Sequence, residues 1–136
     1  MKIRLVTDST ADIPADLLTK HKIEVVPALL IIDGESYADG EGITREEFYA
    51  RMPTMQAPAT TAAPSVGSFM ERYEKLLSAG AEKVLSIHAA STLSGIFNAA
   101  RLAAENFGER VQVFDSKQLS LGCGFQVLSA AEAIAK

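Results

Sequence analysis

The sequence predicts an α/β fold with a mainly parallel sheet flanked by helices. Short apolar runs rich in β-branched residues alternate along the chain with segments whose apolar residues recur at helical spacing. The length of 136 residues suits one domain, and a hydrophobic fraction of 48% is enough for a core. Sheets of this kind bind ligands at the carboxyl ends of their strands, so the loops that follow the strands are candidate sites.

The first part of the chain predicts a strand, a helix and a second strand. Ile3–Thr7 carries no charge after Arg4 and predicts the first strand. A helix follows with Pro14 as its first residue, a position where the missing N–H does no harm. The run Ile23–Ile32 is long, apolar and β-branched, and predicts one continuous strand.

The middle of the chain predicts a hairpin, a helix and a connecting segment. Asp33-Gly34 before Ser36–Ala38 is a hairpin signal. Thr44-Arg45-Glu46-Glu47 is a capping box, which opens a helix that ends near Pro53. Residues 54–64 alternate small, hydroxyl and proline side chains without a helical period, so we expect a loop or an extended segment there.

The next helix and strand are predicted from a cap and an apolar run. Ser65 is placed to cap a helix over Val66–Ser78, which stops at Gly80. Its expected buried stripe has four members: Phe69, Tyr73, Leu76 and Leu77. Lys83–His88 predicts a third strand, central in the sheet.

The last elements continue the alternation. Ser94-Gly95 precedes a helix that ends near Gly108, with Ile96, Ala99, Ala100 and Ala103 at helical spacing. Val111–Phe114 predicts a fourth central strand, and Gln126–Lys136 predicts a final helix. The sequence stops at Lys136 without a Gly or Pro cap, so two interpretations stay open: one domain of a longer protein, or a frayed natural end.

Composition excludes several classes of function. The net charge of −4 and pI of about 5.2 argue against binding nucleic acid or an anionic membrane surface. The longest apolar run, residues 23–32, is broken by Glu24 and Pro27, so we expect no stable membrane insertion. Met1 leads straight into a strand pattern, and Cys123 is the single cysteine. We therefore expect a cytoplasmic protein without a signal peptide, disulfide or metal centre.

Hydroxyl side chains cluster where three strands or extended segments end. They are Ser9 and Thr10, then Thr60 and Thr61 with Ser65, and then Ser91, Thr92 and Ser94. Each group stands just before a predicted helix, whose first N–H groups and dipole favour an anion. The chain therefore looks suited to bind a negatively charged head group. For Thr60–Ser65 and Ser91–Gly95, ordinary helix capping is the alternative interpretation.

Other motifs give weaker signals. Asp8 and Asp12 are four residues apart, unlike the two-residue spacing of phosphatases, so a turn that caps the next helix is the better interpretation. Gly122-Cys123-Gly124 resembles a dinucleotide fingerprint, but Val127 stands where the third glycine belongs. Close packing or a bend in the chain explains these glycines better, and no phosphate-binding P-loop is present. We expect no cofactor.

His88 ends a strand and has no acidic neighbour in the sequence to fix its tautomer. It could act as a phosphocarrier or a general base in a phosphoryl-transfer domain. A structural role, in which it supports nearby ligand-binding residues, is the alternative.

Taken together, these stretches resemble the DegV family, whose members bind fatty acids. The matching segments, in chain order, are Val6–Asp12, Val26-Pro27, Tyr37–Asp39 with Ile43-Thr44, Thr61 with Pro64, Gly67–Phe69, Ile87-His88, Leu93–Gly95, Asp115–Lys117 and Leu121-Gly122. Their order and spacing cover nearly the whole chain, and the series is specific although no single segment is.

The resemblance implies a Rossmann-like N-terminal domain over residues 1–136, without the C-terminal domain that covers it in the family and encloses the acyl chain. It implies that Thr61 and Ser94 hold the carboxylate. The family's histidine near the C-terminus of the full chain has no match here. Ala62 and Ala63 stand where a more polar pair is commoner, which would weaken head-group contacts.

The resemblance also implies a partner. Family members present a long-chain fatty acid to an ATP-dependent fatty acid kinase, whose acyl phosphate product enters phospholipid synthesis. We therefore expect a lipid-binding subunit that is not an enzyme by itself. The expected ligand-binding residues are Thr61, Ser94, Gly95, Leu93, Ser9 and Thr10, supported by His88, Asp8 and Ser116. A phosphoryl-transfer domain that uses His88 is the alternative.

Overall fold

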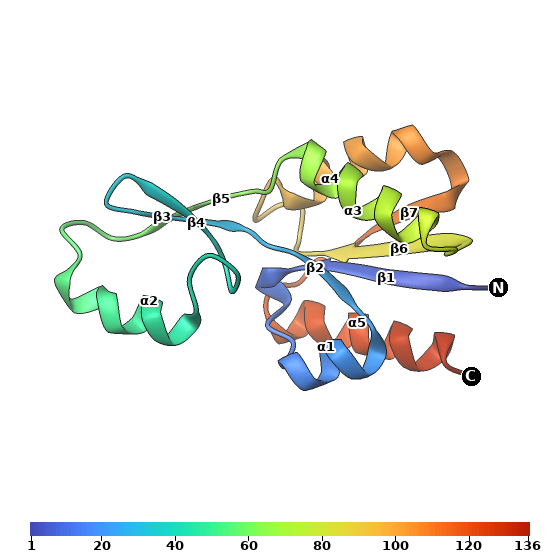
Figure 1. Cartoon of the computed structure of the whole chain (residues 1–136), viewed down its shortest axis with the longest axis horizontal. Coiled ribbons are helices and arrows are strands. Elements are labelled where there is room, and N and C mark those ends of the chain that lie inside the picture. Colours follow the sequence, from blue (N-terminus) through green and yellow to red (C-terminus); the bar gives the residue numbers. More distant parts are fainter.

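The computed structural model describes residues 1–136 and has two sheets. Figure 1 shows a parallel sheet with helices on both faces, from which an antiparallel arm extends. The parallel sheet has four strands in the order β2-β1-β6-β7, and the antiparallel sheet has three in the order β4-β3-β5. The predicted α/β fold with a mainly parallel, helix-flanked sheet is confirmed.

Two central and two edge strands form the parallel sheet. The central strands are β1 (Ile3–Asp8) and β6 (Lys83–His88), and the edges are β2 (Glu24–Val26) and β7 (Val111–Asp115). The prediction that the last strand is central was wrong. It pairs only with β6, and its Phe114 is half exposed.

Helices cover both faces of this sheet. Figure 1 shows α3 (Val66–Ser78) and α4 (Ile96–Ala104) on one face, and α1 (Ala15–His21) and α5 (Leu121–Ile134) on the other. The side chains of a strand alternate between its faces, so each strand supplies both layers. In β1, Val6 packs in a core cluster of 14 buried residues beneath α3 and α4, while Leu5 joins a cluster of 7 beneath α5. The 3-10 turns Ser9–Ala11 (η1) and Glu105–Arg110 (η3) follow β1 and α4.

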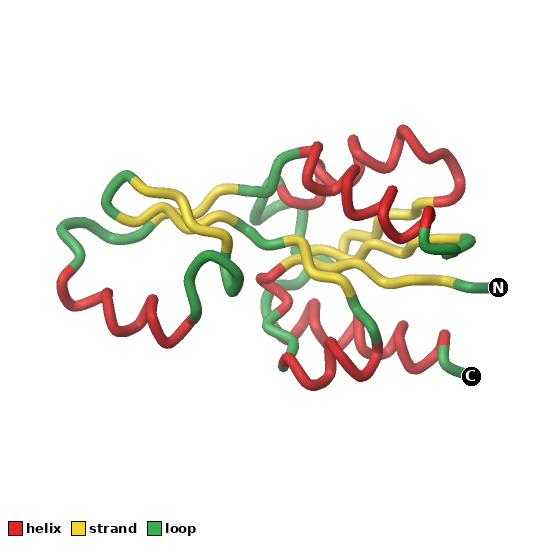
Figure 2. The backbone as a smooth tube through the Cα atoms, viewed as in Figure 1, coloured by secondary structure: helices red, strands yellow, loops and turns green.

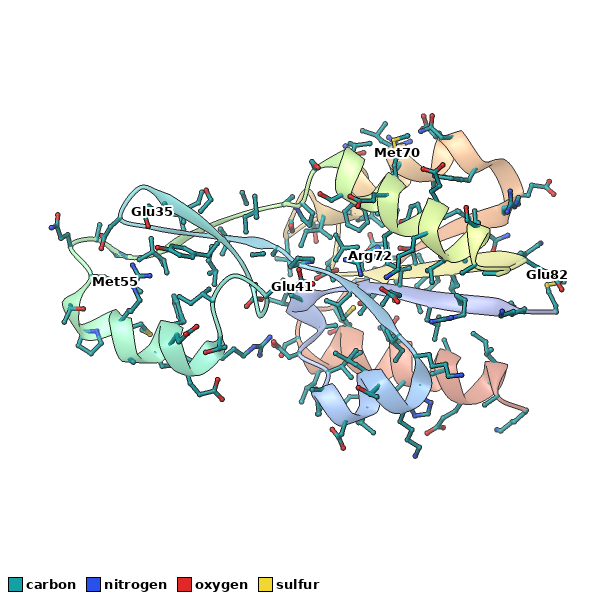
Figure 3. All side chains as sticks on the ribbon, viewed as in Figure 1. Glu35, Glu41, Met55, Met70, Arg72 and Glu82 are labelled. Carbon is teal, nitrogen blue, oxygen red and sulfur yellow. The ribbon has the colours of Figure 1, made fainter.

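Helix α3 is the element that the sequence predicts best. Its observed bounds are those expected, and Ser65 caps it by accepting the Ser68 N–H at 3.1 Å. The predicted buried stripe is confirmed at all four positions. The helix is also joined to the β2 edge, because Arg72 pairs with Glu24 at 2.6 Å. Figure 3 shows Arg72 over the sheet beside β2.

The arm comprises residues 29–62. It contains β3 (Leu29–Ile32), β4 (Glu35–Ala38), α2 (Arg45–Arg51), a 3-10 turn η2 (Met52–Thr54) and β5 (Thr60–Ala62). The predicted hairpin and capping box are both present. Figure 2 shows these strands and this helix apart from the helices that enclose the parallel sheet, and Figure 3 shows Glu41 where the arm meets that sheet.

The prediction of one strand over residues 23–32 was wrong. The segment forms β2 in the parallel sheet and β3 in the arm. Pro27 has no N–H to donate to a strand ladder. The next N–H, of Ala28, donates to Oγ of Ser9 at 2.9 Å instead of to a strand. The chain is therefore free to change sheets at this point.

The final helix begins earlier than predicted, at Leu121, so the glycine pair lies in its first turn. A Cβ atom at Gly124 would lie 2.6 Å from the carbonyl oxygen of Ala11. Only glycine allows η1 and α5 to approach so closely. The interpretation of these glycines as residues for close packing is confirmed at Gly124.

Candidate functional site

A cleft lies at the carboxyl ends of the parallel strands, where the arm meets the parallel sheet. This junction cleft has a volume of about 560 Å³. Five of the predicted ligand-binding residues line it: Thr10, Thr61, Leu93, Ser94 and Gly95. They come from three separate segments, namely η1 after β1, β5 of the arm, and the loop between β6 and α4. The fold thus brings together hydroxyl loops that are far apart in the sequence.

Two hydroxyls in the junction cleft keep their hydrogens available. Ser94 accepts the Ile96 N–H at 3.2 Å through Oγ, and its own hydroxyl hydrogen has no acceptor in the protein. Thr61 is exposed and its hydroxyl makes no hydrogen bond in the structure. Gly95 caps α4 without a side chain, so this helix lacks the side-chain cap from its N-cap residue that α2 and α3 have. Both hydroxyls can therefore donate to an oxygen in the cleft.

The Thr10 hydroxyl is already engaged. Both its N–H, at 3.0 Å, and its hydroxyl donate to Oδ1 of Asp8. Oδ2 of Asp8 accepts from Nδ1 of His88 at 2.8 Å. Burial alone would raise the pKa of Asp8, but the hydrogen bond and charge of His88 and the hydrogen bonds of Thr10 bring that pKa below its ordinary value.

His88 is fully buried, and both of its ring nitrogens have partners. Nε2 lies 2.5 Å from Oγ of Ser86, which also accepts the Tyr73 hydroxyl at 2.8 Å. Burial raises the pKa of that Tyr73 hydroxyl to about 12. No ring nitrogen is free to receive a phosphoryl group in this structure. The acidic partner of His88 is 80 positions away, which explains why the sequence alone did not reveal it.

Ser9 and Ser116 do not line the junction cleft. Ser9 is buried, and its Oγ holds the Ala28 N–H at the point where the chain passes from β2 into the arm. It lines a separate polar cleft of about 550 Å³, beside the ion pair of Arg45 and Asp12. Oγ of Ser116 both accepts from and donates to the backbone of Gln118. Both hydroxyls therefore shape loops here.

The junction cleft is largely aliphatic, and its charge is negative. Asp39 is the one charged residue that lines it, and no Lys, Arg or His does. Apolar lining residues that sequence reasoning missed are Leu29, Leu30, Ala89, Ile96 and Leu119. Leu29 and Leu30 were predicted as strand residues, but their place beside the β6 loop depends on the path of the arm. Leu119 follows β7 in a loop without a recognisable motif.

Two further features bear on possible ligands. No group of three or more His, Cys, Asp or Glu side chains is arranged to hold a metal ion. No helix in the structure has the length and apolar character needed to cross a bilayer.

The chain is similar to known proteins over almost its whole length. The sequence model of the DegV family matches residues 2–136. A DegV domain-containing protein from Listeria innocua is 42% identical over 131 residues, which are 96% of this chain and 47% of the relative. The chain therefore spans about half the length of that relative.

Solved structures are similar in the same way. A DegV family protein from Thermus thermophilus that binds fatty acid matches with a TM-score of 0.91 and 41% identity, over 99% of this chain and 48% of that one. A Thermotoga maritima protein with a fatty acid binding function matches with a TM-score of 0.91 and 31% identity, over 99% of this chain and 50% of that one. The parallel sheet, the arm and the sequence match agree, and this chain belongs to the DegV family.

Proposed function

We propose that this chain is the part of a fatty-acid-binding protein that holds the carboxyl group of a long-chain fatty acid. The observation that carries the proposal is the junction cleft, where the free hydroxyls of Thr61 and Ser94 meet aliphatic walls. Such a cleft suits a ligand with a small polar head and an apolar tail. The fatty acid binding of the Thermus thermophilus and Thermotoga maritima relatives supports it.

The tail supplies most of the affinity in this proposal. Burying one methylene is worth about 0.8 kcal/mol, so a tail of about sixteen carbons supplies on the order of 11 kcal/mol before costs. A hydrogen bond to a charged group adds only about 1.5–3 kcal/mol. The hydroxyls therefore set the orientation of the head group, while the apolar surface sets the strength of binding.

We further propose that a second domain covers the junction cleft in full-length proteins that carry one. Leu93, Leu119, Leu121 and Phe125 are exposed beside the cleft and along the first turns of α5. A lid that packs on these side chains would enclose the tail and could supply the cation that the cleft lacks. Without it, much of the apolar surface of the tail would remain in water.

The biological role that we propose is delivery of the fatty acid to an ATP-dependent kinase in the cytoplasm, for acyl phosphate formation. The chain holds the ligand, and the partner supplies the nucleotide. This division agrees with a site that offers hydroxyls and aliphatic walls, and with a His88 ring that is buried and fully hydrogen-bonded.

The test starts from the double variant Thr61→Ala/Ser94→Ala in the full-length protein, with hexadecanoic acid as ligand. We expect affinity to fall at least about tenfold, because two donors to the head group are lost. The matched control is Thr60→Ala/Thr92→Ala, which removes two neighbouring hydroxyls that do not line the junction cleft. Unchanged binding in the first variant, or an equal loss in both, would contradict the assignment of the site.

A further inference from the structure

The arm is joined by the chain to the rest of the molecule at one narrow place. The chain enters the arm at Leu29 and leaves it at Ala62, and these two residues pair with each other across β3 and β5. The two buried side chains of the arm, Ile32 and Ile43, belong to neither hydrophobic cluster of the parallel sheet. No shared core therefore fixes the angle between the arm and the parallel part, which comprises all residues outside the arm.

Three clefts lie along the boundary between the arm and the parallel part. They are the junction cleft, the polar cleft of about 550 Å³, and a smaller cleft of about 300 Å³ that is lined by residues of α2 and of the loop before α5. Each cleft is lined by residues of both parts, and Asp39 of the arm lines all three. The boundary is therefore largely open, and the few contacts that cross it set the orientation of the arm.

Arg45, the first residue of α2, crosses this boundary between the polar cleft and the smaller cleft, and it lines both. Its guanidinium pairs with Asp12 at 2.6 Å and donates to the carbonyl oxygen of Ser9 at 3.2 Å. It is the only side chain of the arm that makes a hydrogen bond or an ion pair with the parallel part. The other oxygen of Asp12 accepts the Ser120 hydroxyl at 2.6 Å, so this carboxylate is itself held at the start of α5.

Arg45 is also the only cationic side chain at the boundary. No other Lys, Arg or His lines any of the three clefts. The polar cleft beside it is lined by five acidic side chains from both parts, namely Asp8, Asp12, Asp39, Glu41 and Glu46. Without Arg45, the acidic side chains of the arm would face those of the parallel part with no cation between them, and they would repel one another.

We propose that Arg45 is a positioning residue, which holds the arm closed on the parallel part and so keeps Thr61 on the same cleft as Ser94. Thr61 lies on β5 and moves with the arm, whereas Ser94 precedes α4 in the parallel part. Arg45 does not line the junction cleft, so it acts through the arm. When the arm swings outward, the junction cleft widens and a bound fatty acid leaves sooner. The inference rests on the proposed function, since it assumes that a fatty acid occupies this cleft.

The exposure of the ion pair sets the size of the expected effect. The side chains of Arg45 and Asp12 are 50% and 34% exposed. An ion pair this accessible to water adds little to the stability of a whole fold. Its loss should therefore leave the melting temperature almost unchanged, and shift the balance between closed and open arm by about two- to fivefold.

The experiment measures the arm and the ligand separately in the full-length protein. Spin labels on Ser36→Cys in the arm and Glu82→Cys report the distance between the two parts in the ligand-free protein by pulsed electron paramagnetic resonance. Both positions are exposed, and Figure 3 shows Glu82 at the end of the molecule away from the arm. Cys123 is buried and should not react with the label. Displacement of a bound fluorescent fatty acid by excess hexadecanoic acid gives the release rate.

For Arg45→Gln we expect a broader and longer distance distribution, and release about two to five times faster. The matched control is Arg51→Gln, which removes the same charge from the same helix. Arg51 lies over the ring of Tyr37 within the arm, at 5.1 Å, and makes no bond to the parallel part. This control should change neither the distance nor the release rate.

Two further measurements distinguish the charge of Arg45 from the packing of its side chain. Arg45→Lys keeps the charge and should stay close to the wild type. High salt should return Arg45→Gln part of the way to the closed arm, because it screens the repulsion between acidic side chains. If Arg45 acted only by packing, the lysine would not rescue the closed arm and salt would have no effect.

The outcomes separate this inference from the proposed function. An unchanged distance distribution in Arg45→Gln overturns the inference, and so does an equal change in Arg51→Gln. An open arm without faster release overturns the link between the arm and the junction cleft, while the proposed function stands because hexadecanoic acid still binds. If the wild type binds no hexadecanoic acid, the proposed function fails, and the distance measurement still decides whether Arg45 holds the arm.

Discussion

The parallel part of the molecule and the arm are built in different ways. The helices and strands of the parallel part share two clusters of 14 and 7 buried hydrophobic residues. In the arm, residues 29–62, only Ile32 and Ile43 are buried. Yet both parts contribute to the junction cleft, since Ser94 and Thr10 belong to the first and Thr61 to the second. One side of the cleft is therefore rigid, and the other depends on a weakly packed element.

The largest effect is expected in the parallel part. Phe69 is fully buried between α3 and the sheet, so Phe69→Ala should destabilise the protein by about 3–5 kcal/mol in urea denaturation. Tyr49→Ala is the control, because Tyr49 is 64% exposed on α2 and its loss should cost less than about 0.5 kcal/mol. Similar losses for the two variants would mean that the core lies elsewhere.

An intermediate effect is expected at Asp8, and it depends on pH. The folded state lowers the pKa of Asp8 below its ordinary value of 3.8, so the ionised form stabilises the fold above that pH. Stabilisation is lost as pH falls below 3.8, through the folded-state pKa. The groups that face this carboxylate are His88 and the thiol of Cys123.

Asp8→Asn should therefore destabilise the protein by about 1.5–3 kcal/mol at neutral pH, and by less near pH 3. Urea denaturation at both pH values measures the difference. The exposed Asp16→Asn is the control and should change stability by less than about 0.5 kcal/mol at either pH. Parallel stability curves for wild type and Asp8→Asn would show that Asp8 is not the group that titrates.

The smallest effect compares two helix caps, one in each part. Thr44 caps α2 in the arm and Ser65 caps α3 in the parallel part, each by accepting a backbone N–H at 3.1 Å. Replacing either residue by Ala should cost about 1 kcal/mol. We expect Thr44→Ala to speed amide hydrogen exchange in α2 alone, and Ser65→Ala to lower global stability. A global change from Thr44→Ala would show that the arm unfolds together with the rest.

Local signals in the sequence predicted most of the fold. Caps, hairpin residues and apolar periodicity depend on neighbours a few positions apart, and they gave the bounds of α3 and β6 correctly. The split of residues 23–32 was missed, because the apolar run continues through Pro27 and the partner of the Ala28 N–H is Ser9, 19 positions away. The edge position of β7 was missed for a similar reason, because an edge strand differs from a central one in the number of strands it pairs with and not in its residues.

The sequence predicted which residue types form the site, but not the hydrogen bonds that join residues far apart in the chain. The hydroxyl loops are visible in the sequence, and the structure places Thr10, Thr61 and Ser94 around one cleft. No local pattern indicates that Asp8 bonds His88, or that the N–H of Ala89 donates to the same carboxylate. These contacts form only once β1 and β6 pair, so they follow from the topology of the sheet.

The two places where the chain crosses between the parallel part and the arm lie side by side. Leu29, the first residue of β3, pairs with Ala62, the last residue of β5. Adjacent strands are about 4.8 Å apart, so the arm leaves and returns through almost the same point. The arm is therefore an insertion in the domain. A short turn from Leu29 to Ala62 would join the two ends of the parallel part if the arm were removed. An insertion of this kind can change in length or sequence during evolution, because the register of the parallel sheet does not depend on it.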